Sequence, residues 1–320
     1  MENKILDNKN IIEDCIVEIE PCPISFIEIG PLPDVGLDVE VTYSFNTIFA
    51  GTSEINGKYV IVDVEENNRL YRRLMFNSDN TFIQSECILS GDIGTDYLVP
   101  YHRVMIDSLR HIYGGITRVL STEMSFCVLG LGGGLLTKFL YDKFPKSKVT
   151  TVEIDPEMVP IAQKFFNLPE ENERLRLVVD DAIVFLKNSA GIEKFDAIFC
   201  DVAGDNSTEK LVFSPPSGFI TKEVLRTMRD CLNDRGLLLM NFVARDFQTK
   251  SQVKNDIAEI FPKVLSGSYK KDISEIVICP LHRPTKTEQM IARRWKVDKS
   301  KIVKNRGRKP KDIGLKTNKS

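Results

Sequence analysis

The sequence predicts an α/β protein in which a doubly wound, seven-stranded Rossmann-like sheet follows a small antiparallel β domain. Between residues 97 and 284, apolar strand-like runs alternate with segments whose apolar residues recur at helical spacing. That alternation is typical of a parallel sheet covered by helices. Between residues 16 and 96, alternating and β-branched runs are separated by turn signals such as Asn56-Gly57, which is typical of antiparallel hairpins.

The elements of the Rossmann-like domain follow one another in a regular βα order. Five strands are expected first, and a last helix and two more strand-like runs would complete a sheet of seven. The strands are expected within 126–134, 148–155, 174–182, 195–201 and 236–243, with helices over 104–112, 135–144, 156–166, 182–189 and 221–232, a further helix near 249–260, and strands near 263–269 and 274–280.

Both ends of the chain differ in composition from these domains. Residues 1–15 are polar and are expected to be flexible, and residues 285–320 lose apolar periodicity and are expected to be disordered. From residue 286 on, the tail has 13 Lys and Arg against three Asp and Glu, so it carries +10 and the remainder −12 of a net charge of −2. A solvated tail, a nuclear import signal and a weak nucleic-acid contact each explain the basic run at 306–310.

Composition excludes several classes of protein. The chain is 42% hydrophobic and has no apolar run long enough to cross a bilayer, so a globular, cytoplasmic or partly nuclear protein without membrane contact is expected. Seven cysteines lie singly, without a CxxC pair, and only three histidines occur. No metal site is therefore expected. A homodimer is compatible with the sequence, which does not decide the oligomeric state.

Four glycines, Gly130, Gly132, Gly133 and Gly134, separate the first predicted strand from the helix that follows it. Glycine lets a backbone turn tightly and approach a ligand closely, although such a loop also occurs as a bare turn. The second strand ends in Glu153, about 20 residues further on, where a Rossmann fold places the carboxylate that binds ribose hydroxyls. Loop and acid together predict a nucleoside site.

The next two strands also end in acids. Asp180, Asp181 and Ala182 end the third, where a carboxylate can accept a hydrogen bond from an adenine amino group, and Asp201 ends the fourth. Ligands of open α/β sheets bind at these carboxyl ends, although a single acid there is equally explained as a helix cap. The competing class is a dehydrogenase, but the glycines lack the GxGxxG spacing of NAD sites.

The same segments carry a family resemblance. VLGLGGG, VEID, DDA and FDAIFCD resemble the spermidine synthase-like group, whose members place a β domain ahead of a methyltransferase-type fold. Within it, the stretches at 200–225, 236–246 and 275–284 resemble the C-terminal domain of the dual methyltransferases of eukaryotic elongation factor 1-alpha, the methyltransferase-like protein 13 family. With YRRLMF and IQSE, the similarity covers about residues 70–284.

This resemblance implies a protein methyltransferase with a class I methyltransferase sheet, S-adenosylmethionine as cofactor and S-adenosylhomocysteine as product. In the family, one domain methylates a lysine and the C-terminal domain methylates the N-terminal α-amine of the elongation factor. Because only one cofactor loop occurs here, the chain corresponds to the N-terminus-modifying half, with the elongation factor as its expected protein partner.

Two alternatives stay open. One is a polyamine aminopropyltransferase, but Arg103 follows Tyr101-His102 where that group has an acid, and Asp201 is followed by Val202 rather than the usual Pro. The other is a catalytically silent relative that uses the fold to bind a partner.

The resemblance and the chemistry of the residues also suggest roles near the substrate. Asp201 is expected to hydrogen-bond the acceptor amine and draw its proton toward solvent, with Asp205 as a helper, although the surroundings of Asp205 are also ordinary loop composition. Tyr101 and His102, expected just before a helix, are candidates for the peptide entrance, and a capping or packing role is the alternative.

Three further candidates are weaker. Pro215 and Phe219 lie in SPPSGF, which is either a rigid loop over the substrate or a bare turn in which Phe219 belongs to the core. Gln84, in a predicted hairpin strand, resembles a family position near the cofactor.

Overall fold

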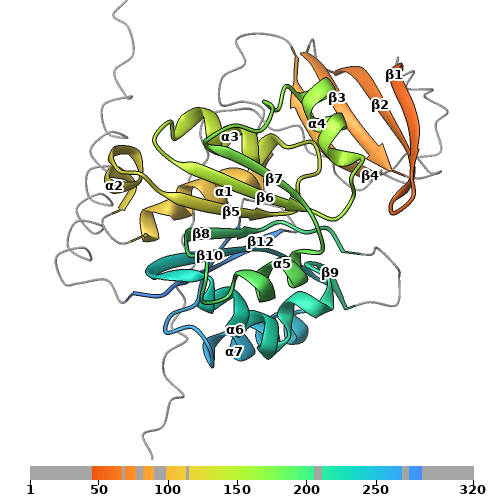
Figure 1. The fold of residues 1–320 in the computed structure, drawn as a ribbon. Coiled ribbons are helices and arrows are strands. Elements are labelled where there is room, and N and C mark those ends of the chain that lie inside the picture. Colours follow the sequence, from red (N-terminus) through yellow and green to blue (C-terminus); the bar gives the residue numbers. More distant parts are fainter. Residues whose placement is uncertain are drawn as a thin grey trace, which may run out of the picture. The chain divides into compact units, whose positions relative to one another are not determined.

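The computed structural model describes residues 45–66, 69–76, 82–89, 99–112, 115–204, 211–268 and 274–282. The strand-like runs expected within 16–44, Asp205 and the basic tail lie outside these ranges. The described residues form a four-stranded and an eight-stranded sheet (Figure 1). In the described part of the chain, no helix has the length and apolar character needed to cross a membrane.

The small sheet is an antiparallel meander of β1 (Phe45–Ser53), β2 (Gly57–Glu66), β3 (Arg69–Phe76) and β4 (Phe82–Ile88), in that spatial order. Ser53 pairs with Gly57 across the first turn, and Gly57 has a φ of 76°, in the left-handed region that favours glycine. The hairpin predicted from Asn56-Gly57 is therefore present.

The large sheet has the predicted Rossmann-like order. Five neighbouring strands are parallel, and two further strands at one edge are joined to them and to each other by antiparallel pairing. The path runs β11 (Leu265–Ser268), β12 (Glu275–Pro280), β10 (Leu232–Ala244), β8 (Phe195–Cys200), β5 (Ser125–Leu129), β6 (Lys148–Glu153) and β7 (Leu175–Val179). These seven strands and the separate small sheet confirm the predicted fold. A short eighth strand, β9 (Val212–Ser214), pairs with the end of β10 and was not predicted.

Helices cover both faces of this sheet (Figure 1). Side chains alternate along a strand, so on β8 Ala197 and Phe199 join one buried cluster while Ile198 and Cys200 join the other. The first cluster includes residues of α1 (Pro100–Ser108), α3 (Leu135–Lys143) and α4 (Met158–Phe166), and the second those of α5 (Ala182–Ser189), α6 (Lys222–Asp230) and α7 (Phe247–Ala258). Shorter segments are η3 (Leu109–His111), α2 (Gly115–Ser121) and η4 (Ser217–Ile220).

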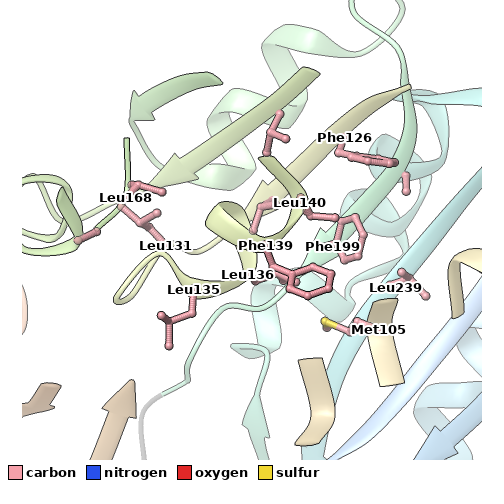
Figure 2. Packing of buried hydrophobic residues seen from close by; sticks show 14 of the residues in the cluster. Met105, Phe126, Leu131, Leu135, Leu136, Phe139, Leu140, Leu168, Phe199 and Leu239 are labelled. Carbon is pink, nitrogen blue, oxygen red and sulfur yellow. The ribbon is translucent and has the colours of Figure 1, made fainter. Parts of the chain in front are cut away.

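Figure 2 shows how the first cluster joins separate elements. Met105 of α1, Leu136 and Leu140 of α3, and Phe126 and Phe199 of the central strands are all buried within it. The small sheet also contributes to this cluster, through Tyr59, Ile61, Leu74 and Cys87. One continuous apolar core therefore connects the small sheet to the helices beside the glycine loop.

Candidate functional site at the carboxyl edge of the parallel sheet

The glycine loop connects β5 to α3, as the sequence predicted. Gly130, Gly132 and Gly134 have φ values of 93°, 52° and 75°, a region that other residues rarely adopt. A Cβ on Gly130 would collide with the backbone oxygen of Asp201. The loop and the end of β8 are therefore in direct contact, and glycine is required for this approach.

Glu153, at the end of β6, holds the loop in place. Its Oε2 accepts a hydrogen bond from the Leu131 N–H at 2.7 Å, and its Oε1 accepts one from the Asp155 N–H at 3.0 Å. Each carboxylate oxygen has a second lone pair, and Glu153 is only half-buried. The side chain thus has a fixed orientation and can still accept hydrogen bonds from the hydroxyls of a ribose.

Asp181 and Ala182, at the end of β7, have structural roles in the described chain. Asp181 is the N-cap of α5, since its Oδ1 accepts from the N–H groups of Ile183 at 2.7 Å and Val184 at 3.3 Å. Ala182 is buried in the core below. The helix-capping alternative is therefore realised, and a contact of Asp181 with an adenine stays a prediction, which its exposed position permits.

Sequence reasoning missed an apolar surface beside these acids. Ile154 follows Glu153 and is 49% exposed, and Val179, the register partner of Glu153 on β7, is 52% exposed. Large apolar side chains left exposed beside a carboxylate suit the flat face of a purine. The signal in the sequence was the apolar residue directly after the strand-ending acid.

Asp201 lies at the centre of a hydrogen-bonded cluster. Its Oδ2 is 2.7 Å from His102 Nε2 and accepts from the Tyr101 hydroxyl at 3.3 Å, and its Oδ1 accepts from Asn241 Nδ2 at 3.1 Å. The structure thus brings together three residues that the sequence predicted separately. Tyr101 and His102 lie within the first turn of α1, which begins at Pro100, and not before the helix as predicted.

Asn241 was not predicted. It lies on β10, the strand beside β8, and is 8% exposed. The available signal was a lone amide in the apolar run LLLMNFV, because a polar side chain in a buried strand needs a partner. Within the described residues, two buried atoms of the cluster lack a hydrogen-bond partner, His102 Nδ1 and Asn241 Oδ1.

The carboxylate of Asp201 sets the direction of the hydrogen bonds in the cluster. A carboxylate only accepts, so His102 Nε2 donates to Asp201 Oδ2, and His102 Nδ1 has no partner among the described residues. The carboxylate then receives donors from three side chains and remains the acceptor of the group. Its side chain is 14% exposed, so it retains a small opening to solvent.

The SPPSGF segment is tied to this cluster at its first residue. Ser214 Oγ donates to the carbonyl oxygens of Val202 at 3.0 Å and Asn241 at 3.3 Å. Pro215, next to it, is buried. Phe219 is 6% exposed and packs in the core cluster beneath α5 and α6, which is the packing alternative noted for it. The expected contacts of Pro215 and Phe219 with a substrate stay predictions.

Gln84 on β4 lies close to the glycine loop. Its Nε2 is 3.8 Å from the position that a Cβ on Gly132 would occupy. Its contact with a cofactor stays a prediction. Asp205 lies outside the described residues. Among the described residues, no group of three or more His, Cys, Asp or Glu side chains is arranged to hold a metal ion.

The fold and this site define a nucleoside-binding, Rossmann-like α/β domain preceded by an antiparallel sheet. The chain belongs to the spermine/spermidine synthase domain family, whose model matches residues 112–272. This confirms the resemblance to the spermidine synthase-like group.

Relatives within this similarity have more specific names. The chain is 29% identical to the eEF1A lysine and N-terminal methyltransferase homolog of Drosophila melanogaster, over 90% of this chain and 43% of the relative. It is 31% identical to the homolog of Drosophila pseudoobscura pseudoobscura, over 75% of this chain and 37% of the relative. The chain thus spans less than half of the length of these curated relatives.

A solved structure is similar as well. Human methyltransferase-like protein 13, crystallised in complex with SAH, has 26% sequence identity to this chain and a TM-score of 0.55. The similarity covers 68% of this chain and 96% of the human one.

Proposed function

We propose that the chain is an S-adenosylmethionine-dependent protein N-methyltransferase whose acceptor is the N-terminal α-amine of translation elongation factor 1-alpha. The names of the relatives and the SAH bound to the human structure support a protein methyltransferase. The observation on which the proposal rests most is the Asp201 carboxylate, held by three donors directly beside the glycine loop.

The residues present fit the cofactor. Gly132 is half-buried at the tip of the loop, Glu153 has free lone pairs for two ribose hydroxyls, and Ile154 with Val179 offers an apolar face for adenine. Asp181 lies exposed at the end of the next strand. When bound, S-adenosylmethionine supplies a methyl group on an electron-poor sulfonium.

The part played by the protein is to align and deprotonate the acceptor. Methyl transfer is an in-line displacement, so a neutral nitrogen must point at the methyl carbon. An α-amine has an ordinary pKa of about 7.7–8.0, against about 10.4 for a lysine, so a larger fraction is neutral near pH 7. Asp201, whose side chain is 14% exposed, would accept a hydrogen bond from this amine and orient the lone pair of its nitrogen.

A peptide α-amine suits this cluster better than a diamine. A diamine carries a second ammonium group that needs its own carboxylate, and this chain has Arg103 at the position where polyamine synthases have an acid. An arginine side chain cannot supply that carboxylate. A peptide needs no second carboxylate, because the backbone that follows its N-terminal residue is neutral.

The test compares three acceptors with the purified chain. A peptide matching the processed N-terminus of the elongation factor is incubated with S-adenosylmethionine, beside the same peptide acetylated at its α-amine, and putrescine is offered with decarboxylated cofactor. Mass spectrometry should detect methyl groups on the free peptide alone. Equal methylation of the acetylated peptide would point to a lysine acceptor, and consumption of putrescine would establish polyamine synthesis.

A further inference from the structure

We propose that Ser85 and Asp155 are positioning residues for the cofactor, and that through them the four-stranded sheet clamps the glycine loop in its binding conformation. The small sheet would then contribute to cofactor binding and not only pack beside the cofactor site. This inference rests on the proposed cofactor but not on the identity of the methyl acceptor.

The first contact is made by β4. Ser85 Oγ accepts a hydrogen bond from the Gly133 N–H at 2.8 Å. The strand and the loop approach so closely that a Cβ on Gly133 would lie 2.8 Å from the Ser85 Cβ, and one on Gly132 would lie 3.0 Å from Ser85 Oγ. Ser85 therefore fixes the orientation of the Gly133 peptide group, on the α3 side of the loop tip.

The second contact starts at the turn between β1 and β2. Ser53 Oγ and Asn56 Nδ2 each donate to Asp155 Oδ2 at 2.5 Å. Asp155 is 1% exposed, so this carboxylate depends on such donors for its stability. Its own N–H donates to Glu153 Oε1, and Glu153 Oε2 accepts from the Leu131 N–H. An unbroken series of hydrogen bonds thus connects the small sheet to the β5 side of the loop.

The two contacts hold opposite sides of the loop tip. Leu131 is fixed through Glu153 and Asp155, and Gly133 is fixed by Ser85. Gly132 lies between them and is half-buried, whereas Leu131 and Gly133 are buried. A loop that is already ordered loses less conformational entropy when the ligand binds. The clamp should therefore strengthen cofactor binding without taking part in the chemistry.

The first experiment removes the acceptor of the Gly133 N–H with Ser85→Ala. We expect S-adenosylhomocysteine to bind about five- to tenfold more weakly by calorimetry, since one hydrogen bond that orders the loop is lost. The Gly133 amide should exchange faster with solvent in the ligand-free protein. The KM for S-adenosylmethionine should rise while kcat at saturating cofactor stays within about twofold, and Ser85→Thr, which keeps the hydroxyl, should recover most of the affinity.

A matched control is Ser121→Ala. Within the part of the chain that the structure describes, the exposed Ser121 hydroxyl donates to the Arg118 carbonyl oxygen of its own helix and has no contact with the glycine loop. This variant should leave the affinity and the Gly133 exchange rate unchanged.

The second experiment weakens the other contact. Asp155→Asn should also lower the affinity for S-adenosylhomocysteine. Asp142→Asn, on the exposed face of α3, is its control. If Asp155→Asn fails to fold, Ser53→Ala removes one donor to the same carboxylate and should give a smaller loss of affinity.

If Ser85→Ala and Ser53→Ala both bind S-adenosylhomocysteine like the wild type, with unchanged Gly133 exchange, the small sheet is only a packing partner and the inference is overturned. Absence of binding by the wild-type protein would be a different result, because it would contradict the proposed cofactor itself.

Discussion

Replacement of Asp201 by Asn separates cofactor binding from catalysis. The carboxylate accepts from His102 and Tyr101 at one oxygen and from Asn241 at the other. An Asn side chain keeps the shape but places an NH2 group at one of these positions. If that group faces Asn241, the amide of Asn241 can turn and present its unpartnered Oδ1 as the acceptor. The variant should therefore fold.

The cost in stability can be bounded from these contacts. Hydrogen bonds to a charged group contribute about 1.5–3 kcal/mol and neutral ones about 0.5–1.5 kcal/mol, so the free energy of unfolding should fall by about 1–3 kcal/mol. The rate should fall much further. The amine loses an anionic acceptor for its proton, and such groups contribute about 10²- to 10⁴-fold in rate.

The assay is a single-turnover measurement with saturating S-adenosylmethionine and a free N-terminal peptide. We expect the rate to fall by about 100-fold or more, while calorimetry shows S-adenosylhomocysteine affinity within about twofold of wild type. Asp142→Asn, the same chemical change in an exposed ion pair with Lys138, serves as control. A wild-type rate in Asp201→Asn, or a parallel loss of rate and affinity, would refute the assigned role.

Three other predictions follow from the loop, a half-buried histidine and the tail. Gly132→Val should abolish the rise in melting temperature that S-adenosylhomocysteine causes, whereas Gly191→Val, equally strained at φ 76° but in open space, should keep it. Burial, with the nearby charge of Arg110, lowers the pKa of His111 from 6.5 to about 4. The unfolded chain therefore binds the extra proton, and the free energy of unfolding should fall by up to about 3 kcal/mol as the pH drops from 6.5 toward 4. In urea unfolding measured at several pH values, His111→Gln should reduce this dependence on pH. Deletion of residues 286–320 should leave peptide methylation within about twofold, since this sequence lacks apolar periodicity, and a sharp loss of activity would contradict it.

Much of the fold follows from local pattern. Strands buried on both faces, such as Phe195–Cys200, give short apolar runs, and the intervening helices repeat at their own period. β9 escaped prediction because three residues, Val212–Ser214, are too few to show a period. β10 begins at Leu232, inside the segment expected to be helical up to that residue, because α6 already ends at Asp230.

The site was predictable where it follows from topology alone. Glu153 and Asp201 end parallel strands, and such ends meet at one edge of the sheet. Asn241 and Ser85 contact residues far away in the sequence, which no local pattern records. Phe219 was a candidate for substrate contact and packs in the core. An aromatic residue in a loop has the same sequence signal in both cases.

The most direct test of the proposed function uses the intact acceptor. Elongation factor 1-alpha, purified after removal of its initiator methionine and without prior methylation, is incubated with this chain and S-adenosylmethionine, and fragment mass spectrometry then locates the added methyl groups. We predict that they lie on the N-terminal α-amine and that Asp201→Asn lowers their yield by about 100-fold or more. Methyl groups found only on lysine side chains, or none on a factor whose free N-terminus is verified, would contradict the proposal.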